Sequence, residues 1–187
     1  LGQGTDVTRT DKPLTRLGFA LLDIFGHRKI LREPYPGIFH LAIFYGFLAL
    51  LITTTLVALQ ADFFWPLFQW YFFKDKFYLA LSLFADVFGG LALLGVIMAL
   101  VRRYVIKPDW LDQRREDIII LWFILFILVS GFLAEGLRMQ ATELQPGSPM
   151  TDYIWFSPVG RMFAFLFASL SVETAQSVHR IVWWIHM

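Results

Sequence analysis

Long apolar segments separated by short polar loops dominate the chain. Residues 41–61 and 118–134 contain no charged side chain, and residues 77–101 contain only Asp86. A helix needs roughly 20 apolar residues to cross a hydrocarbon layer about 30 Å thick, and these segments have that length. The pattern therefore predicts three membrane-spanning helices, over residues 37–60, 77–104 and 117–138.

The C-terminal part of the chain follows a less regular pattern. Residues 158–171 are apolar but short, and a polar stretch around Glu173 separates them from the apolar run at the end. We expect a short fourth span over 158–171 and the truncated start of a fifth, or else four spans with the last one broken. Either way the predicted fold is an all-α integral membrane helical bundle.

The N-terminal region differs from the rest in being polar or amphipathic. Residues 1–35 are expected to form a polar lead followed by an interfacial helix that ends near Gly26. Pro34 and Pro36 then stop any helix before the first span. The second predicted domain, residues 36–187, is the membrane domain. We expect the protein to extend beyond both Leu1 and Met187.

Basic residues are distributed unevenly between the loops. Lys and Arg are concentrated before the first span and between the second and third, whereas the opposite loops carry few. Because cytoplasmic loops are enriched in Lys and Arg, residues 1–35 and 102–117 are predicted to be cytoplasmic. The expected location is the inner (cytoplasmic) membrane of a prokaryote, with multiple passes.

Composition excludes several classes of function. The formal net charge of +1 gives no electrostatic basis for binding nucleic acid, so the expected surroundings are membrane lipid. The sequence contains no cysteine, which excludes disulfides, thiol catalysis and cysteine-ligated iron–sulfur clusters within this sequence. A metal would have to be held by the four histidines or by carboxylates.

Three histidines are candidate haem ligands. His40 lies about one turn inside the first predicted span. Placing an imidazole in the hydrocarbon layer costs free energy, so a histidine at this position indicates a functional role. His179 and His186 share one helix face at levels about 10 Å apart, and a b-type haem takes axial ligands from facing helices. His186 is the better candidate because His179 adjoins polar residues. The alternative for each is a hydrogen bond at the membrane interface.

Three carboxylates and a lysine are candidates for handling quinone and protons. Asp86 and Glu135 fall within predicted spans, and Glu173 begins the last one. Carboxylates at membrane depth commonly mark proton or substrate paths. Together with Lys74 they are predicted to frame a quinone pocket on the outer side. Glu135 and Glu173 could instead be solvated residues at the interface.

The order of these segments resembles a known family. GIFHLAIFYGFLALL, FGGLALLGVIMALVRRYVIKP, EDIIILWFILFILVSGF and HRIVWWIHM occur in this order. The set resembles the gamma-subunit cytochrome of respiratory nitrate reductase, and more closely the membrane domain of heterodisulfide-reductase-related iron–sulfur oxidoreductases. The resemblance covers residues 14–187. It implies a cytochrome b-like bundle of five helices that holds one or two b haems and exchanges electrons with a menaquinone-like quinone.

The resemblance assigns some ligands and leaves others open. His40 matches the first of two family histidines ten residues apart, but the second position is Leu50. His186 matches the first histidine of the family's fifth helix, whose second histidine would lie beyond Met187. Two alternatives follow: a single haem, for example between His40 and His186, or a second haem that uses His179 or a residue outside this sequence.

The resulting functional hypothesis is a membrane-anchoring electron-transfer subunit that is not catalytic alone. It would relay electrons through b-type haem between the quinone/quinol pool and an iron–sulfur module. That module, on the cytoplasmic side, would be another subunit or a C-terminal domain, because this sequence lacks the cysteines for clusters. The alternative is a haem-free membrane anchor or a small subunit that transports protons or ions.

Overall fold

The computed structural model describes residues 12–27, 30–109, 111 and 114–187, and this part of the chain contains helices, turns and loops but no strand. Three helices are long and apolar enough to cross a membrane. They confirm the prediction of an all-α membrane bundle. The chain divides into two compact units, Leu1–Ile38 and Phe39–Met187, which are described separately. The three long helices are Pro34–Phe68, Asp75–Ile106 and Arg115–Ala141.

The first unit contains the predicted amphipathic helix. Helix α1 (Pro13–Gly26) ends at the expected glycine, and His27 follows it with a left-handed backbone (φ 47°). Large apolar side chains such as Leu14 and Phe19 are exposed along α1. A short 3₁₀ turn, η1 (Ile30–Arg32), precedes the first turn of α2. The exposed apolar face suits an interfacial helix.

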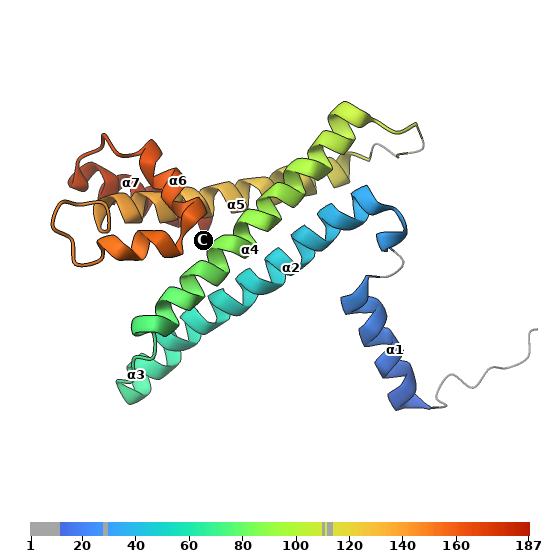
Figure 1. The fold of residues 1–187 in the computed structure, drawn as a ribbon, viewed down its shortest axis with the longest axis horizontal. Coiled ribbons are helices and arrows are strands. Elements are labelled where there is room, and N and C mark those ends of the chain that lie inside the picture. Colours follow the sequence, from blue (N-terminus) through green and yellow to red (C-terminus); the bar gives the residue numbers. More distant parts are fainter. Residues whose placement is uncertain (1–11, 28–29, 110, 112–113) are drawn as a thin grey trace, which may run out of the picture. The chain divides into compact units, whose positions relative to one another are not determined.

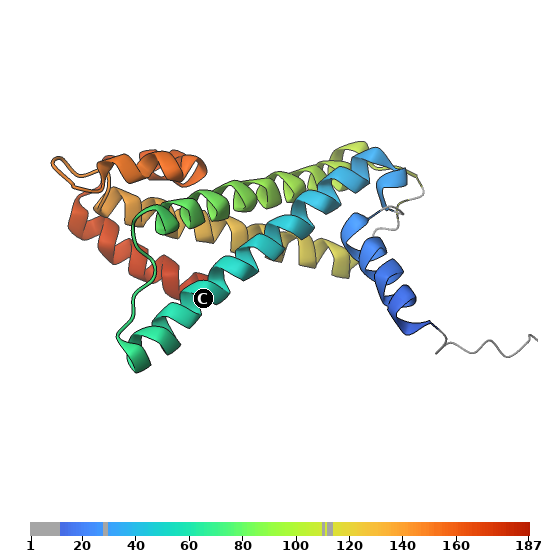
Figure 2. The same cartoon turned by 60° about the horizontal axis from the view of Figure 1, so that its bottom comes forward.

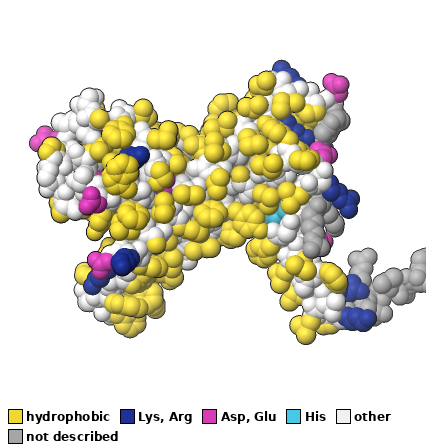
Figure 3. Space-filling view, viewed as in Figure 1, with side chains coloured by type: hydrophobic (Ala, Val, Ile, Leu, Met, Phe, Trp, Pro, Cys, Tyr) yellow, Lys and Arg dark blue, Asp and Glu magenta, His cyan; other side chains and the backbone are white. Residues whose placement is uncertain are grey.

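The second unit begins within α2 and contains the other two long helices. Helices α2 and α4 run antiparallel and side by side (Figures 1 and 2). Apolar side chains cover their visible face, whereas charged side chains gather toward the helix ends (Figure 3). The elements are α2 (Pro34–Ala58), η2 (Leu59–Phe64), α3 (Trp65–Phe68), α4 (Asp75–Val101), η3 (Arg102–Ile106) and α5 (Arg115–Ala141).

Small residues let α2 and α4 approach closely. A Cβ added at Gly46 of α2 would lie 2.5 Å from the Ala92 Cβ, and one added at Gly95 of α4 would lie 2.8 Å from the Phe39 carbonyl oxygen. Close backbone contact through small residues is the usual packing of membrane helices. Around this contact, Ala92 and Val96 form a buried core with Leu128 of α5.

A buried glutamine holds the aromatic connection between α3 and α4. The Gln60 side chain donates to the Trp70 carbonyl oxygen at 2.9 Å and accepts from the Phe72 backbone N–H at 2.8 Å. These two bonds satisfy backbone groups that regular secondary structure leaves unpaired. The side chains of this connection are largely aromatic, as expected at a membrane interface.

The fourth predicted span is wrong. Within residues 158–171 the structure forms only α6 (Pro158–Leu166), whose nine residues are about 14 Å long and cannot cross the hydrocarbon layer. A turn follows, and Ser171 caps α7 (Val172–His186) by accepting from the Thr174 N–H. Helices α6 and α7 both pack against α5 (Figure 1). The apolar residues of 158–171 are therefore used to cover α5.

Candidate functional site

Helices α2, α4, α5 and the last turn of α7 enclose a pocket of about 420 Å³ at the level of the long apolar helices. This volume lies within the usual range of cofactor and ligand pockets. Most of its wall is aliphatic or aromatic, including Leu50 and Leu128. Three ionisable side chains interrupt the apolar wall, namely Asp86, Glu135 and His186. The structure thus brings together three of the residues that the sequence singled out.

His186 is held by two small residues of α5. Its Nδ1 lies 2.9 Å from the Ser130 hydroxyl oxygen, and that hydroxyl donates to the Ile127 carbonyl oxygen at 3.0 Å. With the serine hydrogen used in this way, Ser130 can accept from an Nδ1–H of His186. In that tautomer of the neutral ring, Nε2 keeps the lone pair that a metal-binding imidazole requires.

Gly131 allows the imidazole to lie close to α5. A Cβ added at Gly131 would stand 3.1 Å from Cε1 of His186, so a larger residue would push the ring away. Ser130 and Gly131 therefore form a small contact surface, the His186 seat, that fixes the position of the ring. Metal-binding histidines commonly have their second nitrogen held in this way.

Asp86 binds the N-terminus of a neighbouring helix. Its side chain is 2% exposed. The two carboxylate oxygens accept from the backbone N–H groups of Val159 at 2.8 Å and Gly160 at 2.7 Å. Both groups belong to the first turn of α6, whose N–H groups have no partners within the helix. The carboxylate thus caps α6 from outside, a structural role that the sequence did not predict.

Glu135 lies next to this capped helix end. A Cβ added at Gly160 would come within 2.6 Å of the Glu135 carboxyl carbon, so the carboxylate rests directly on α6. The buried Ser157 at the start of α6 lies beside this carboxylate, and its hydroxyl oxygen lies 2.8 Å from the Ser82 hydroxyl oxygen. Side chains from α4, α5 and the start of α6 therefore surround Glu135 with polar groups.

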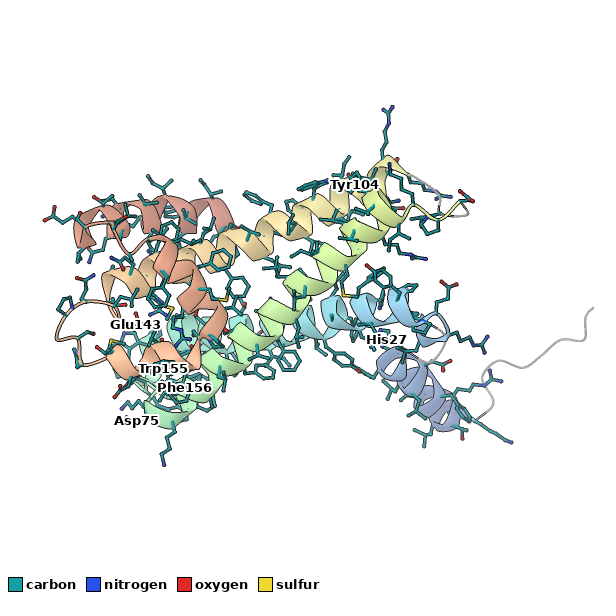
Figure 4. The ribbon with its side chains drawn as sticks, turned by 45° about the horizontal axis from the view of Figure 1, so that its top comes forward. His27, Asp75, Tyr104, Glu143, Trp155 and Phe156 are labelled. Atoms are coloured by element: carbon teal, nitrogen blue, oxygen red, sulfur yellow. The ribbon has the colours of Figure 1, made fainter. Side chains whose placement is uncertain are left out.

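An ion pair lies just beyond Glu135. Arg138 donates to Glu143 at 2.6 Å, and the Glu143 side chain is 2% exposed. Thr142 donates to the other carboxylate oxygen of Glu143. In Figure 4, Glu143 lies at the same end of the bundle as Trp155 and Phe156. The buried carboxylate of Glu143 needs such a partner, because burying an isolated charge costs free energy.

The remaining predicted site residues lie outside the central pocket. Lys74 is exposed immediately before α4, and Glu173 is exposed in the first turn of α7. His179 lines a separate pocket of about 320 Å³ together with Arg138. The structure therefore brings neither Lys74 nor Glu173 to the residues that they were predicted to accompany.

His40 and His186 do not share this pocket. His40 precedes Leu50 on α2 by ten residues, which is about 15 Å along the helix axis. Leu50 itself lines the pocket with His186. The position at which the family resemblance implies a partner histidine is thus occupied by an aliphatic side chain. Haem ligation by His40, His179 or His186 stays a prediction.

Sequence reasoning missed several residues of this region. Ser130 and Gly131 form a small pair in the middle of an apolar span, a pattern that could have indicated close contact with another side chain. Arg138 and Glu143 are opposite charges five residues apart at the end of that span. Only Lys and Arg were counted in the loops, so the sequence analysis gave no sign that Arg138 pairs with Glu143.

Comparison with known proteins finds similarity to oxidoreductases. No family model matches it, and no solved structure matches it significantly. It is 33% identical, over 97% of its length, to the EtfAB:quinone oxidoreductase of Syntrophomonas wolfei. It is 25% identical, over 92% of its length, to the probable iron-sulfur-binding oxidoreductase FadF of Bacillus subtilis.

A third relative belongs to a heterodisulfide reductase. The chain is 29% identical, over 88% of its length, to one subunit of the dihydromethanophenazine:CoB–CoM heterodisulfide reductase of Methanosarcina barkeri. It spans 63% of that relative but only 25% and 23% of the first two. These similarities confirm the predicted resemblance to heterodisulfide-reductase-related oxidoreductases. With the three long apolar helices they indicate a multi-pass membrane protein. The resemblance to the nitrate reductase cytochrome stays a prediction.

Proposed function

We propose that this chain is the membrane electron-transfer part of a quinone-linked oxidoreductase. It would relay electrons between the quinone/quinol pool and an iron–sulfur module on the cytoplasmic side. Relatives whose names specify a quinone oxidoreductase and an iron-sulfur-binding oxidoreductase support this proposal. Because the sequence has no cysteine, the clusters would belong to another subunit or to another domain of the same protein.

The proposal includes a b-type haem in the central pocket. The observation that carries it is the His186 seat, where Nδ1 contacts Ser130 and the neutral ring would present Nε2 to a metal. A bound haem would supply a one-electron carrier within the bilayer. Leu50 offers no ligand, so among the described residues that line this pocket His186 is the only axial candidate. His186 would hold the iron, and Ser130 would orient the imidazole.

A difference spectrum of the full-length protein in membranes tests this proposal. The reduced-minus-oxidised spectrum should contain a b-type band that His186→Ala removes. His179→Ala is the matched control, because His179 lies on the same helix but lines a different pocket. A wild-type spectrum without the band, or a band that persists in His186→Ala, would contradict the haem site. His40→Ala with unchanged absorbance would exclude a haem shared by His40 and His186.

A haem-free membrane anchor or a small proton or ion transport subunit is the second candidate. It is favoured by Leu50, which stands in the pocket where a second histidine is implied by the resemblance. In that case Asp86, Glu135 and His186 would bind and release protons, and His186 would not bind iron. The same wild-type spectrum distinguishes the two, since this candidate gives no b-type band.

A further inference from the structure

We propose that a second pocket, enclosed by α2, α4, α5 and the connection before α4, binds the headgroup of a quinone and that Glu135 accepts a proton from the quinol. The pocket has a volume of about 290 Å³. Glu135 and Ala85 line both this pocket and the central one, so the two pockets adjoin. The choice of quinone as the occupant rests on the proposed function, whereas the polar pocket itself is independent of the haem.

One wall of this second pocket carries convergent polar groups. Tyr78, Ser82 and Arg138 contribute a phenol, a hydroxyl and a guanidinium, all of which can donate hydrogen bonds. A quinone presents carbonyl oxygens that need such donors. Glu143 accepts from one guanidinium nitrogen of Arg138 at 2.6 Å, which neutralises the arginine and holds it in place. Because the charge of Arg138 is balanced by Glu143, this wall suits the neutral, polar ring of a quinone better than it suits an anion.

The other wall is apolar and faces the lipid. Val57, Phe73 and Leu81 line it, and Val57 is 48% exposed on the surface of α2. In a membrane that surface contacts hydrocarbon, so a quinone with an isoprenoid tail could enter sideways while its tail stays in lipid. Phe73 offers an aromatic face for the ring. A mostly apolar pocket with a few polar groups is typical of sites for small ligands.

Glu135 is placed to take part in the proton balance of quinol oxidation. Oxidation of one quinol to quinone releases two electrons and two protons. The electrons would pass singly to the one-electron carrier of the proposed function, and one proton would pass to the Glu135 carboxylate. The second proton would leave with water. Arg138 also lines the pocket of about 320 Å³ that contains the exposed Arg180, so the two pockets meet at Arg138.

Photoaffinity labelling of the full-length protein in liposomes tests this site. The probe is an azido-ubiquinone, with menaquinone as the competitor, and labelled residues are located by mass spectrometry. We expect labels at or beside Val57, Phe73 or Leu81 that the competitor removes. Labels confined to the central pocket, labels that phospholipid alone displaces, or no competed label at all would overturn the proposal.

Two sets of variants sharpen the test. Leu81→Trp should fill the pocket and reduce labelling at least tenfold, whereas Leu83→Trp, on the exposed lipid side of the same helix, should leave it unchanged. Tyr78→Phe should raise the KM for a soluble quinol several-fold with a smaller change in kcat. Glu135→Gln should lower kcat about tenfold or more and alter its pH profile. Equal labelling in the two tryptophan variants would overturn the site.

The outcomes separate this inference from the proposed haem. Labelling needs no haem, so a competed label in a protein without a b-type band refutes the haem and leaves the quinone site intact. A b-type band in a protein without the label refutes the quinone site and leaves the haem intact. Wild-type labelling does not depend on any variant, so a variant that fails to fold does not remove the test.

Discussion

Replacement of Asp86 by alanine tests the structural role of the most deeply buried carboxylate in the central pocket. In the native protein its two oxygens accept from the first-turn N–H groups of Val159 and Gly160 at 2.8 and 2.7 Å. Alanine removes both acceptors and leaves two donors without partners. The site is buried among apolar helices, so water cannot easily replace the carboxylate.

The expected loss of stability follows from these two bonds. A buried donor left unsatisfied costs about 1–3 kcal/mol, so Asp86→Ala should lower the free energy of unfolding by about 2–6 kcal/mol. Asp86→Asn keeps one acceptor oxygen but points an NH₂ group at the other donor, and should cost about half as much. Asp62→Ala, an exposed carboxylate in η2, should cost less than about 0.5 kcal/mol.

Unfolding in mixed detergent micelles, followed by tryptophan fluorescence, measures these differences. Proteolysis of the connection 142–157 provides a second measurement, since release of α6 should expose that segment. The reasoning is refuted if Asp86→Ala is as stable as Asp62→Ala. It is also refuted if Asp86→Ala keeps its stability and loses only quinol oxidation, since Asp86 would then act on protons and not on α6.

Two further predictions concern packing and charge. Gly46→Leu should separate α2 from α4, because even a Cβ at this position would lie 2.7 Å from the Phe88 carbonyl oxygen. We expect it to lower the free energy of unfolding by about 1–3 kcal/mol in the same assay. Gly18→Ala is the control, because Gly18 has open space around it. Arg138→Leu should cost about 3–5 kcal/mol because it leaves Glu143 buried without its partner, whereas the double variant Arg138→Leu/Glu143→Leu should recover most of that loss. Additive effects of the two charge substitutions would contradict the pairing.

The long helices could be predicted because each contains an uninterrupted apolar run of sufficient length. The same criterion failed at 158–171, where Ser157 and Pro158 start a helix and Ser171 starts another. These start signals were visible in the sequence. Hydropathy alone does not reveal them, because α6 and α7 are apolar for a different reason: they pack on α5.

The candidate site could be predicted only residue by residue. His186, Asp86 and Glu135 stood out because each is ionisable in an apolar stretch, and the structure places all three around one pocket. Their grouping depends on the register of four helices, which the sequence does not specify. Lys74 and Glu173 were chosen because their loops share one side of the membrane. That criterion says nothing about depth, and both residues lie outside the pocket.

The short α6 accounts for much of the charge within the apolar bundle. A helix that ends inside a membrane protein exposes N–H groups that lipid cannot satisfy, so such an end must be buried against polar groups. Asp86 supplies the acceptors for α6, and Ser157 at its start bonds Ser82 and lies beside Glu135. The carboxylate of Glu135 thus lies against the same helix end that Asp86 caps. A longer fourth helix that crossed the membrane would carry its N-terminus past this level, and Glu135 would no longer lie against a polar helix start. The departure from the predicted span is therefore what allows an ionisable group to stand between the two pockets.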